Sequence, residues 1–322
     1  MSEGDSWQPS VSLDILKQRA QFIDQIRVFM ASRDILEVET PYLSAAGNTD
    51  PNICNISLSL QLRKTRQYFL HSSPEFAMKR LLAAGSGAIY QICRVFRDLE
   101  LSALHQPEFT MLEWYRPGFD HYQLMDELAE LLSLIGFQTP VSYSFRQIFL
   151  LANTLDPHKS SLAQLIKVAV QRGLIDTTAS QLTRQGLLDF IISDIFDKEY
   201  KDCAPMYVHS YPACMCALAK IEKHEEGMIA RRFELIIHGV EIANGYDELR
   251  DPDEHLSRVQ AEASIRQQQQ QADIPIDTYL IEALKHGLPS TAGVAVGLER
   301  LFMLLIDADT IGQTRAFDFE RC

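Results

Sequence analysis

The sequence of 322 residues has no long hydrophobic run and no excess of basic residues. Its apolar stretches are far shorter than the roughly 20 residues that a membrane-spanning helix needs, which excludes such a helix. Lysine and arginine together number 30, against 43 aspartates and glutamates, so the formal net charge is −13. This balance argues against a protein that holds nucleic acid through its overall charge, although it leaves room for a local basic patch.

Patterned cysteines and a secretory signal are also missing. Among six cysteines only Cys214 and Cys216 stand close together, and no second pair lies at the spacing of a zinc site. Small buried thiols explain that pair better than a metal does. The opening MSEGDSWQPS has no basic region followed by an apolar one, so we expect a cytoplasmic protein without membrane association.

The composition that is present, 46% hydrophobic and 23% charged residues, is that of a folded globular protein. Helical and strand patterns mix without a regular βαβ alternation, which predicts an α+β fold with an antiparallel sheet flanked by helices. The stretch 140–203 has helical periods but no recognisable chemistry. The predicted helices are 13–32, 75–84, 122–135, 253–272, 277–286 and 299–307. The predicted strands are 36–40, 88–97, 107–116, 205–209, 232–241 and a last strand that begins at Gly293. A hairpin turn is predicted at His238–Gly239.

The strand 107–116 places unusual residues on one face. Because side chains alternate along a strand, Phe109, Met111, Glu113 and Tyr115 point the same way. A carboxylate in such a row is costly to bury without a partner. The row therefore indicates either a ligand-binding face or a salt-bridged structural strand.

Three glutamates recur seven residues apart in FELIIHGVEIANGYDEL, at Glu234, Glu241 and Glu248. Carboxylates gathered beside a phosphate ligand commonly hold Mg²⁺, whereas a single glutamate is more often an ordinary surface residue. Downstream, GVAVGLERL runs from Gly293 to Leu301. Its glycines permit the close approach of a ligand or of another backbone, and the guanidinium of Arg300 suits phosphate oxygens.

Taken together and in order, ILEVETPYL, FRDLELSALHQPEFTMLEWYRP and GVAVGLERL resemble motifs 1, 2 and 3 of class II aminoacyl-tRNA synthetases. SSPEF, HQPEFTMLEWY and EIANGYDEL are similar to signatures of the lysyl branch. The resemblance covers nearly the whole chain and implies a tail at 1–12 followed by one synthetase-like catalytic domain at 13–322, with 140–203 as a variable helical insertion.

Lysyl-tRNA synthetases carry an anticodon-binding domain before this point, and the first predicted helix at residue 13 leaves no room for one. The pattern thus resembles the freestanding paralogues that ligate (R)-β-lysine to elongation factor P. That resemblance implies an ATP- and Mg²⁺-dependent enzyme, which adenylates (R)-β-lysine or lysine and transfers it to a lysine ε-amine of elongation factor P. It further implies a homodimer built on motif 1, and no tRNA partner. A helix and strand packed within one subunit remain the alternative for motif 1.

The same resemblance implies roles at the nucleotide. Arg97 contacts the α-phosphate and the substrate carboxylate, Arg300 holds the γ-phosphate, and Glu234 and Glu241 bind Mg²⁺. Without the resemblance, Arg97 would be read as an ordinary ion pair at a strand end.

Further residues surround the ATP in this family. His105 lies at the pyrophosphate end, Phe109 stacks on adenine, Gly297 leaves room for the other face of the ring, and Ile242 lines the nucleotide. The remaining implied ATP residues are Asp98, Leu99, Glu100 and Gln106.

For the amino acid, the resemblance assigns Glu75 to the amine near the reacting carboxyl group. It assigns Glu113, Tyr115 and Glu248 to the ammonium at the end of the side chain. Two carboxylates and a phenol suit a diamine, because a buried ammonium requires both charge pairing and acceptors. The other implied substrate residues are Ser73, Pro74 and Ala295.

Three positions depart from the family pattern. Leu99 replaces the glutamate of motif 2, so either the loop bulges and Glu100 substitutes for it, or a contact to adenine is absent. Gln106 replaces an asparagine and is one carbon longer. Ala295 replaces a glycine, which reshapes the pocket and agrees with a substrate other than α-lysine.

Other functions stay open at this point. A truncated lysyl-tRNA synthetase would acylate tRNA, a catalytically silent paralogue would only bind lysine or a nucleotide, and a related ligase would modify a small molecule. The net charge of −13 counts against the tRNA enzyme.

Overall fold

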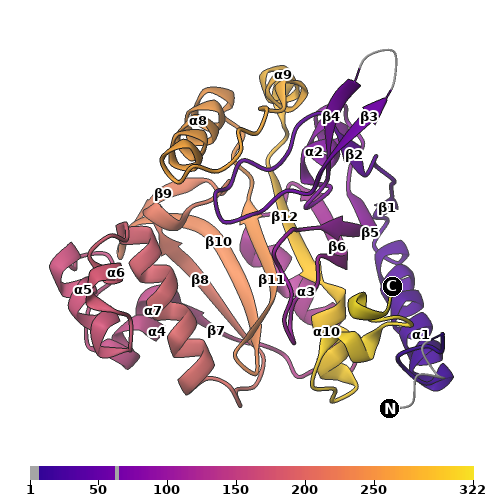
Figure 1. The fold of residues 1–322 in the computed structure, drawn as a ribbon, viewed down its shortest axis with the longest axis horizontal. Helices are drawn as coiled ribbons and strands as arrows, with labels where there is room; N and C mark the ends of the chain where they lie inside the picture. Colours follow the sequence, from indigo (N-terminus) through magenta and orange to yellow (C-terminus); the bar gives the residue numbers. More distant parts are fainter. Residues whose placement is uncertain (1–6, 62–64) are drawn as a thin grey trace. The chain divides into compact units, whose positions relative to one another are not determined.

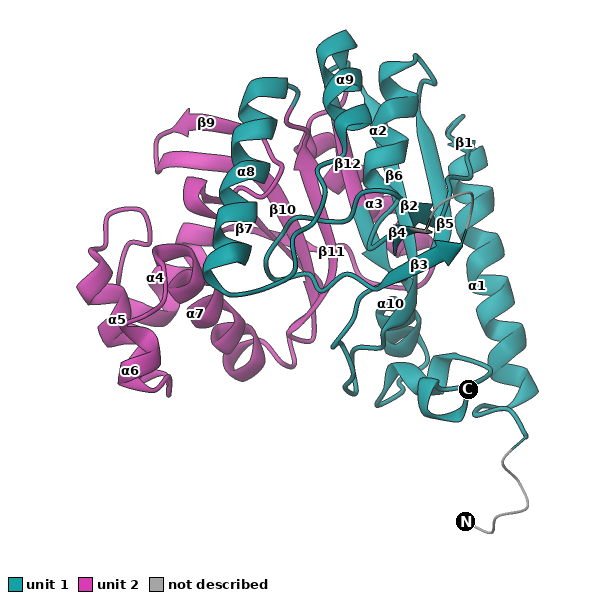
Figure 2. Ribbon diagram, turned by 45° about the horizontal axis from the view of Figure 1, so that its top comes forward, with its two compact units in different colours: residues 1–118, 250–291, 295–322 teal, residues 119–249, 292–294 magenta. Residues whose placement is uncertain are grey.

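The computed structural model describes residues 7–61 and 65–322. These residues group into two compact units, coloured separately in Figure 2. Unit 1 is built from 1–118, 250–291 and 295–322, and unit 2 from 119–249 and 292–294. Unit 1 therefore combines both ends of the sequence, while unit 2 is largely one continuous segment. That the whole of 13–322 folds as a single domain stays a prediction.

Unit 1 centres on an antiparallel ladder between β5 (Ile89–Phe96) and β6 (Glu108–Pro117) (Figure 1). The ladder is unbroken from the Ile89–Tyr115 pair to the Phe96–Glu108 pair. The side chains of Leu112 and Trp114 on β6 are fully buried, as expected for the face opposite Glu113. The ladder thus fixes which side chains of β6 share a face and which belong to the core.

The other elements of unit 1 surround this ladder. β1 pairs with β5 in parallel, and β2, β4 and β3 form a separate three-stranded sheet. Met78 and Leu82 of α2 (Glu75–Ala83) pack with Leu280 and Leu284 of α9 (Thr278–Gly287) in one apolar cluster. The helices are α1 (Leu13–Ala31), α2 (Glu75–Ala83), α8 (Pro252–Gln268), α9 (Thr278–Gly287), α10 (Leu298–Leu305), and the short 3₁₀ helices η2 (Ile311–Thr314) and η3 (Phe319–Arg321); the remaining strands are β1 (Leu36–Glu37), β2 (Leu43–Ser44), β3 (Ser57–Gln61) and β4 (Thr65–Leu70).

Unit 2 contains a sheet in the order β11-β10-β8-β7, with β9 paired to β10. All these pairings are antiparallel except the parallel one between β7 and β8. β12 (Thr291–Gly297) contributes its residues 292–294 to this unit. The other elements are α3 (His121–Leu134), β7 (Val141–Ser144), α4 (Phe145–Asn153), α5 (Leu162–Gln171), α6 (Asp176–Ala179), α7 (Arg184–Glu199), β8 (Met206–Pro212), η1 (Ala213–Met215), β9 (Ile221–His224), β10 (Gly227–Ile237) and β11 (Val240–Asp247).

The helical stretch of unit 2 forms for local reasons. Ser144 and Ser161 each begin a helix with a capping box, in which the hydroxyl accepts the N3 amide and the N3 glutamine returns a hydrogen bond. α4, α5 and α7 bury apolar residues such as Phe145, Leu165 and Ile191 in one cluster with β8 and β10. This confirms the helical character predicted for 140–203, although the stretch begins with the strand β7.

Several sequence predictions need correction. The strand predicted at 36–40 is reduced to Leu36–Glu37, whose side chains are both exposed, although Val38 packs against an apolar cluster and Thr40 is buried. β3 and β4 were not predicted, nor was β9 or the first part of β10. The turn at His238–Gly239 is confirmed. Both residues have positive φ, 51° and 76°, as a two-residue turn between twisted strands requires.

None of the helices described in 7–61 and 65–322 has the length and apolar character needed to cross a membrane.

Gly245 offers a test of packing in unit 2. It stands opposite Phe233 across the β10–β11 ladder, and a Cβ there would lie 2.4 Å from Cε1 of that buried ring. Gly245→Ala therefore lowers the free energy of unfolding by about 1–3 kcal/mol through overpacking. Urea denaturation measures the change.

The matched control is Gly186→Ala in α7, where a Cβ would meet Leu182 no closer than an ordinary contact of 3.5 Å. In a helix this change stabilises by about 0.5–1 kcal/mol. Equal effects of the two substitutions would contradict the packing described for β10 and β11.

Candidate functional site

Glu113 is a buried acid on β6 of unit 1. Its side chain is 2% exposed, and both of its oxygens are hydrogen-bonded. Ser73 Oγ donates to Oε2 at 2.7 Å, and the Tyr115 hydroxyl donates to Oε1 at 2.6 Å. The Tyr115 ring packs among apolar residues of α2 and α9, so this residue belongs to the core and to the polar cluster at once.

A second acid, Glu75, lies at the start of α2 and is paired with a buried lysine. Lys79 Nζ is 2.6 Å from Glu75 Oε1, and the lysine side chain is only 1% exposed. The Glu75 amide donates to Ser73 Oγ at 2.9 Å, so the one serine contacts both acids. Ser73, Pro74 and Glu75 also line a pocket of about 100 Å³. The SSPEF segment therefore lines the pocket and is joined to Glu113 through Ser73.

The environment shifts the proton affinity of Glu113. Burial, followed by the negative charge of Glu75, raises the pKa of the Glu113 carboxyl to about 7. The hydrogen bonds from Tyr115 and Ser73 and the charge of Lys79 act in the opposite direction. A cation placed beside Glu113 would stabilise its charged form, so the site is suited to an ammonium group.

Arg97 follows β5 and has spare capacity for an anion. Its amide donates to the carbonyl of Pro107 at 2.9 Å, which closes the base of the 98–106 loop. Its guanidinium lies 5.1 Å from the Phe109 ring centroid, and NH1 is 3.9 Å from Glu100 Oε1. Within the residues that the structure describes, the buried Nε of Arg97 makes no hydrogen bond. These features fit a phosphate contact as well as the alternative of a strand-end ion pair.

The departure at Leu99 has a backbone explanation. Leu99 has a φ of 63° and an 83% exposed side chain, and its amide donates to its neighbour Asp98 Oδ1 at 2.8 Å. The left-handed residue turns the loop, and the next side chain, Glu100, reaches back toward Arg97. The local geometry favours the bulged loop over the simple loss of a carboxylate.

Arg300 and His105, assigned separately from the sequence, are in contact. The Arg300 guanidinium NH2 is 2.6 Å from His105 Nε2, and its Nε donates to the carbonyl of Leu104 at 3.1 Å. An arginine only donates, so Nε2 accepts, and the other ring nitrogen carries the proton toward Ser102 Oγ, 2.9 Å away. α10 thus places Arg300 against the 98–106 loop.

The side chain of Gln106 is held by the C-terminal segment. The Arg315 guanidinium donates to its Oε1 at 2.5 Å, and its Nε2 donates to Asp318. Both ends of the amide are engaged by the C-terminal segment, and the contact of Gln106 with ATP stays a prediction. Ala295 packs against the apolar group that includes Met111 and Phe109. Gly297 is the residue that precedes α10.

In unit 2, Glu234 and Glu241 lie on the β10–β11 hairpin. Glu241 pairs with Ile236, two residues from Glu234 on the same face of β10. Arg232 donates to Glu234, while burial raises the pKa of Glu234 to about 7, Arg232 opposes the rise, and the charge of Glu241 adds to it. Within the described ranges no group of three or more His, Cys, Asp or Glu side chains is arranged for a metal ion. The pair would therefore fit Mg²⁺ only with oxygen ligands from phosphates and water.

The two remaining predicted residues are buried in unit 2. Ile242 sits where the β10–β11 register shifts, between the pairs Ile236–Glu241 and Leu235–Ala243. Glu248 forms an isolated bridge with Ala219 just beyond β11.

Sequence reasoning missed the partners of the predicted residues. Lys79 lies four residues after Glu75, a spacing at which helical side chains meet, so its pairing carried a readable signal. Arg232 lies two residues before Glu234, on the same face of the strand. The contacts of Arg315 with the 98–106 loop, by contrast, had no local signal.

Comparison with known proteins adds independent information. The family described as tRNA synthetases class II (D, K and N) matches residues 7–321. The elongation factor P–(R)-β-lysine ligase of Vibrio atlanticus is 41% identical over 320 residues, covering 98% of this chain and 99% of the relative. The protein of the same name from Haemophilus ducreyi is 40% identical over 98% of this chain and 97% of its own, and that from Pectobacterium carotovorum is 41% identical with both chains fully covered. The chain therefore belongs to the class II tRNA synthetase family of the D, K and N type.

Proposed function

We propose that this protein is an ATP-dependent ligase of the cytoplasm that adenylates (R)-β-lysine, or lysine less well, and transfers it to a lysine ε-amine of elongation factor P. The observation that carries the proposal is the buried Glu113, held by Tyr115 and Ser73 beside the Glu75–Lys79 pair. This arrangement suits the ammonium of a diamine. The full-length relatives, which carry the name of this ligase, support the choice of acceptor.

The first step joins the amino acid to AMP. A carboxylate oxygen attacks the α-phosphorus of ATP, the bond to the β-phosphate oxygen breaks, and pyrophosphate leaves. Arg97 would stabilise charge on the α-phosphate, and Arg300 would hold the γ-phosphate with His105 near the pyrophosphate end. The ring of Phe109 would stack on adenine. Mg²⁺, held by Glu234 and Glu241, would neutralise phosphate charge.

The second step forms an amide. The acceptor ε-amine attacks the carbonyl carbon of the adenylate, AMP leaves with the bonding electrons, and the amine nitrogen loses a proton. Glu75 would hold the amine nearer the carboxyl group, and Glu113, Tyr115 and Glu248 would hold the distal ammonium. A neutral amino acid would leave buried carboxylates unpaired, so we expect it to bind poorly.

We further propose a homodimer formed through α1 and the segment that follows it. Large hydrophobic side chains are exposed there, including Val28 (61%), Leu36 (57%) and Tyr42 (44%). Apolar surface of this kind is typical of a subunit interface.

The deciding experiment is the intact mass of elongation factor P after incubation with this protein, ATP, Mg²⁺ and either lysine isomer, with tRNA as a competing acceptor. We expect one lysine-sized mass gain on elongation factor P, larger with (R)-β-lysine, and no acylated tRNA. Label on tRNA alone would contradict the proposal in favour of a truncated lysyl-tRNA synthetase.

Arg300→Ala tests the phosphate assignment. Because the guanidinium would stabilise charge on the transferring phosphates, we expect ATP–pyrophosphate exchange to fall on the order of 100-fold or more. Arg146→Ala, on the opposite unit and paired with Asp156 near the surface, is the matched control and keeps normal exchange. Near-normal exchange with Arg300→Ala and an intact fold would remove Arg300 from the nucleotide site.

The pH dependence of substrate binding tests Glu113. Its pKa is raised to about 7, so the carboxyl is neutral below that pH and charged above it. An ammonium prefers the charged form, and KM for lysine in exchange therefore falls as the pH rises from about 6 to about 8. Glu113→Gln raises KM and removes this dependence. A pH profile that stays the same in the variant would assign the titration to another group, such as Glu234.

A further inference from the structure

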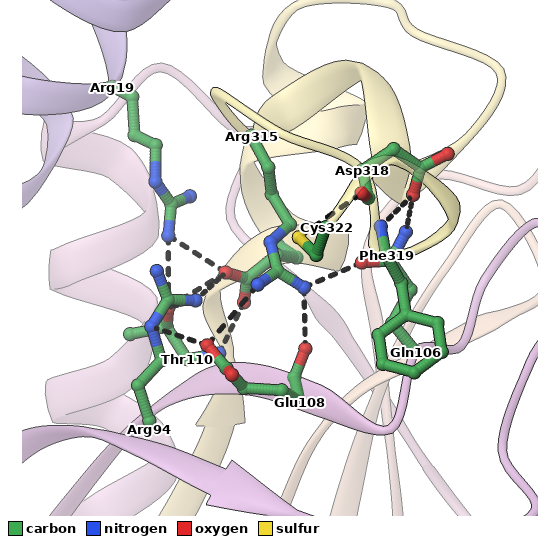
Figure 3. Close-up of polar contacts among 10 residues, drawn as sticks. Arg19, Arg94, Gln106, Glu108, Thr110, Arg315, Asp318, Phe319 and Cys322 are labelled. Carbon is green, nitrogen blue, oxygen red and sulfur yellow. Dashed lines mark hydrogen bonds and ion pairs between the residues drawn. The ribbon is translucent and has the colours of Figure 1, made fainter. Parts of the chain in front are cut away.

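The C-terminal segment contacts the 98–106 loop at several points along its length. The Ile311 amide donates to the carbonyl of Ala103 at 2.9 Å. Arg315 donates to Gln106 Oε1 at 2.5 Å, and Gln106 in turn donates to Asp318 (Figure 3). We call residues 311–318 the C-terminal support. It holds the loop at its middle and at its return into β6.

The C-terminal support is also tied to the strand pair by charge. Arg315 NH1 donates to the carbonyl of Glu108 at 2.6 Å, and its NH2 is 3.3 Å from Glu108 Oε1. Arg94 of β5 is 3.3 Å from the same carboxylate oxygen and 3.3 Å from Glu299 Oε1. The carboxylate of Glu299 accepts the amide and the hydroxyl of Thr110, each at 2.7 Å. The network thus joins the C-terminal support, β5, β6 and the residue next to Arg300.

The position of Asp318 depends on a glycine. A Cβ on Gly312 would lie 2.8 Å from Asp318 Cγ, closer than real atoms approach. The Asp318 amide is held by Ser10 Oγ at 2.9 Å, and the Ser10 amide donates to the carbonyl of Ala316 at 2.6 Å. Any side chain at position 312 would therefore require the Asp318 carboxylate to move.

We infer that the C-terminal support positions the 98–106 loop for the nucleotide, with Asp318 and Arg315 as positioning residues that act through Gln106 and Glu108. This inference rests on the proposed function, since it concerns the loop assigned to ATP. A loop that carries an exposed left-handed residue, Leu99, loses conformational freedom when it binds a ligand. If the ends of the loop are already held in place, that entropic cost is smaller, and Arg97 and His105 keep their positions relative to each other.

Two substitutions disturb the C-terminal support without changing a residue of the 98–106 loop. Gly312→Ala displaces the Asp318 carboxylate by steric contact, and Asp318→Asn removes its charge at constant size. Glu320→Gln is the matched control, because it removes a charge from an exposed side chain two residues further on. Each variant is measured for KM of ATP and of lysine in ATP–pyrophosphate exchange, for amide hydrogen exchange at residues 98–106, and for urea unfolding.

We expect both test variants to raise KM for ATP by about ten-fold, the size of one charge-assisted hydrogen bond, with KM for lysine changed less than about two-fold. Amides of the loop exchange faster in both, while Glu320→Gln matches the parent protein. Unchanged loop exchange in both variants would overturn the inference. Equal rises in both KM values together with lost stability would also overturn it, because that pattern marks a purely structural role.

The hydrogen-exchange readout separates the inference from the proposed function. If the parent protein shows no lysine-dependent pyrophosphate exchange, the proposed function fails, and the loop amides alone then decide whether residues 311–318 support the loop.

Discussion

The antiparallel ladder between β5 and β6 is the constraint on which unit 1 depends. Its unbroken register carries Arg97 to the end of one strand and Glu113 and Tyr115 along the other. One face of β6 carries the fully buried Leu112 and Trp114, and the other carries Glu113 and Tyr115, which is also buried. A shift of the register by one residue would exchange the two faces. Phe109, Glu113 and Tyr115 would then point to the side that Leu112 and Trp114 now occupy.

The ladder also explains why buried acids are tolerated. Glu113 and Glu299 are each 2% exposed, but they are satisfied in different ways. Glu299 accepts the Thr110 amide and hydroxyl and is approached by Arg19 and Arg94. Glu113 has two hydroxyl donors, and its pKa rises because of burial and, second, the negative charge of Glu75, which is itself paired with Lys79. One acid is therefore a structural anchor, and the other retains a demand for positive charge that a diamine would meet.

Local patterns foresaw much of this arrangement. Alternation in 107–116 identified the shared face of Phe109, Glu113 and Tyr115, and the pair His238–Gly239 identified its turn, because both signals lie within a few residues. The strand at 36–40 was overestimated, since β1 is an edge strand whose two side chains are exposed. The partners of Gln106 were not predicted, because they are 209 and 212 residues away. Contacts at that separation leave no periodic trace in the sequence.

The discontinuous make-up of unit 1 has a consequence for synthesis. Unit 2 is nearly continuous in sequence and its helices are capped by neighbouring residues. Most of the contacts it needs for folding are therefore available soon after residue 249 leaves the ribosome. Thr110, in contrast, waits for Glu299, which follows 189 residues later. The first 118 residues can therefore form the β5–β6 ladder early, but β6 lacks the Glu299 carboxylate until much later. Unit 1 therefore cannot be completed until the end of the chain has been synthesised, and the 98–106 loop gains its contacts with residues 311–318 last.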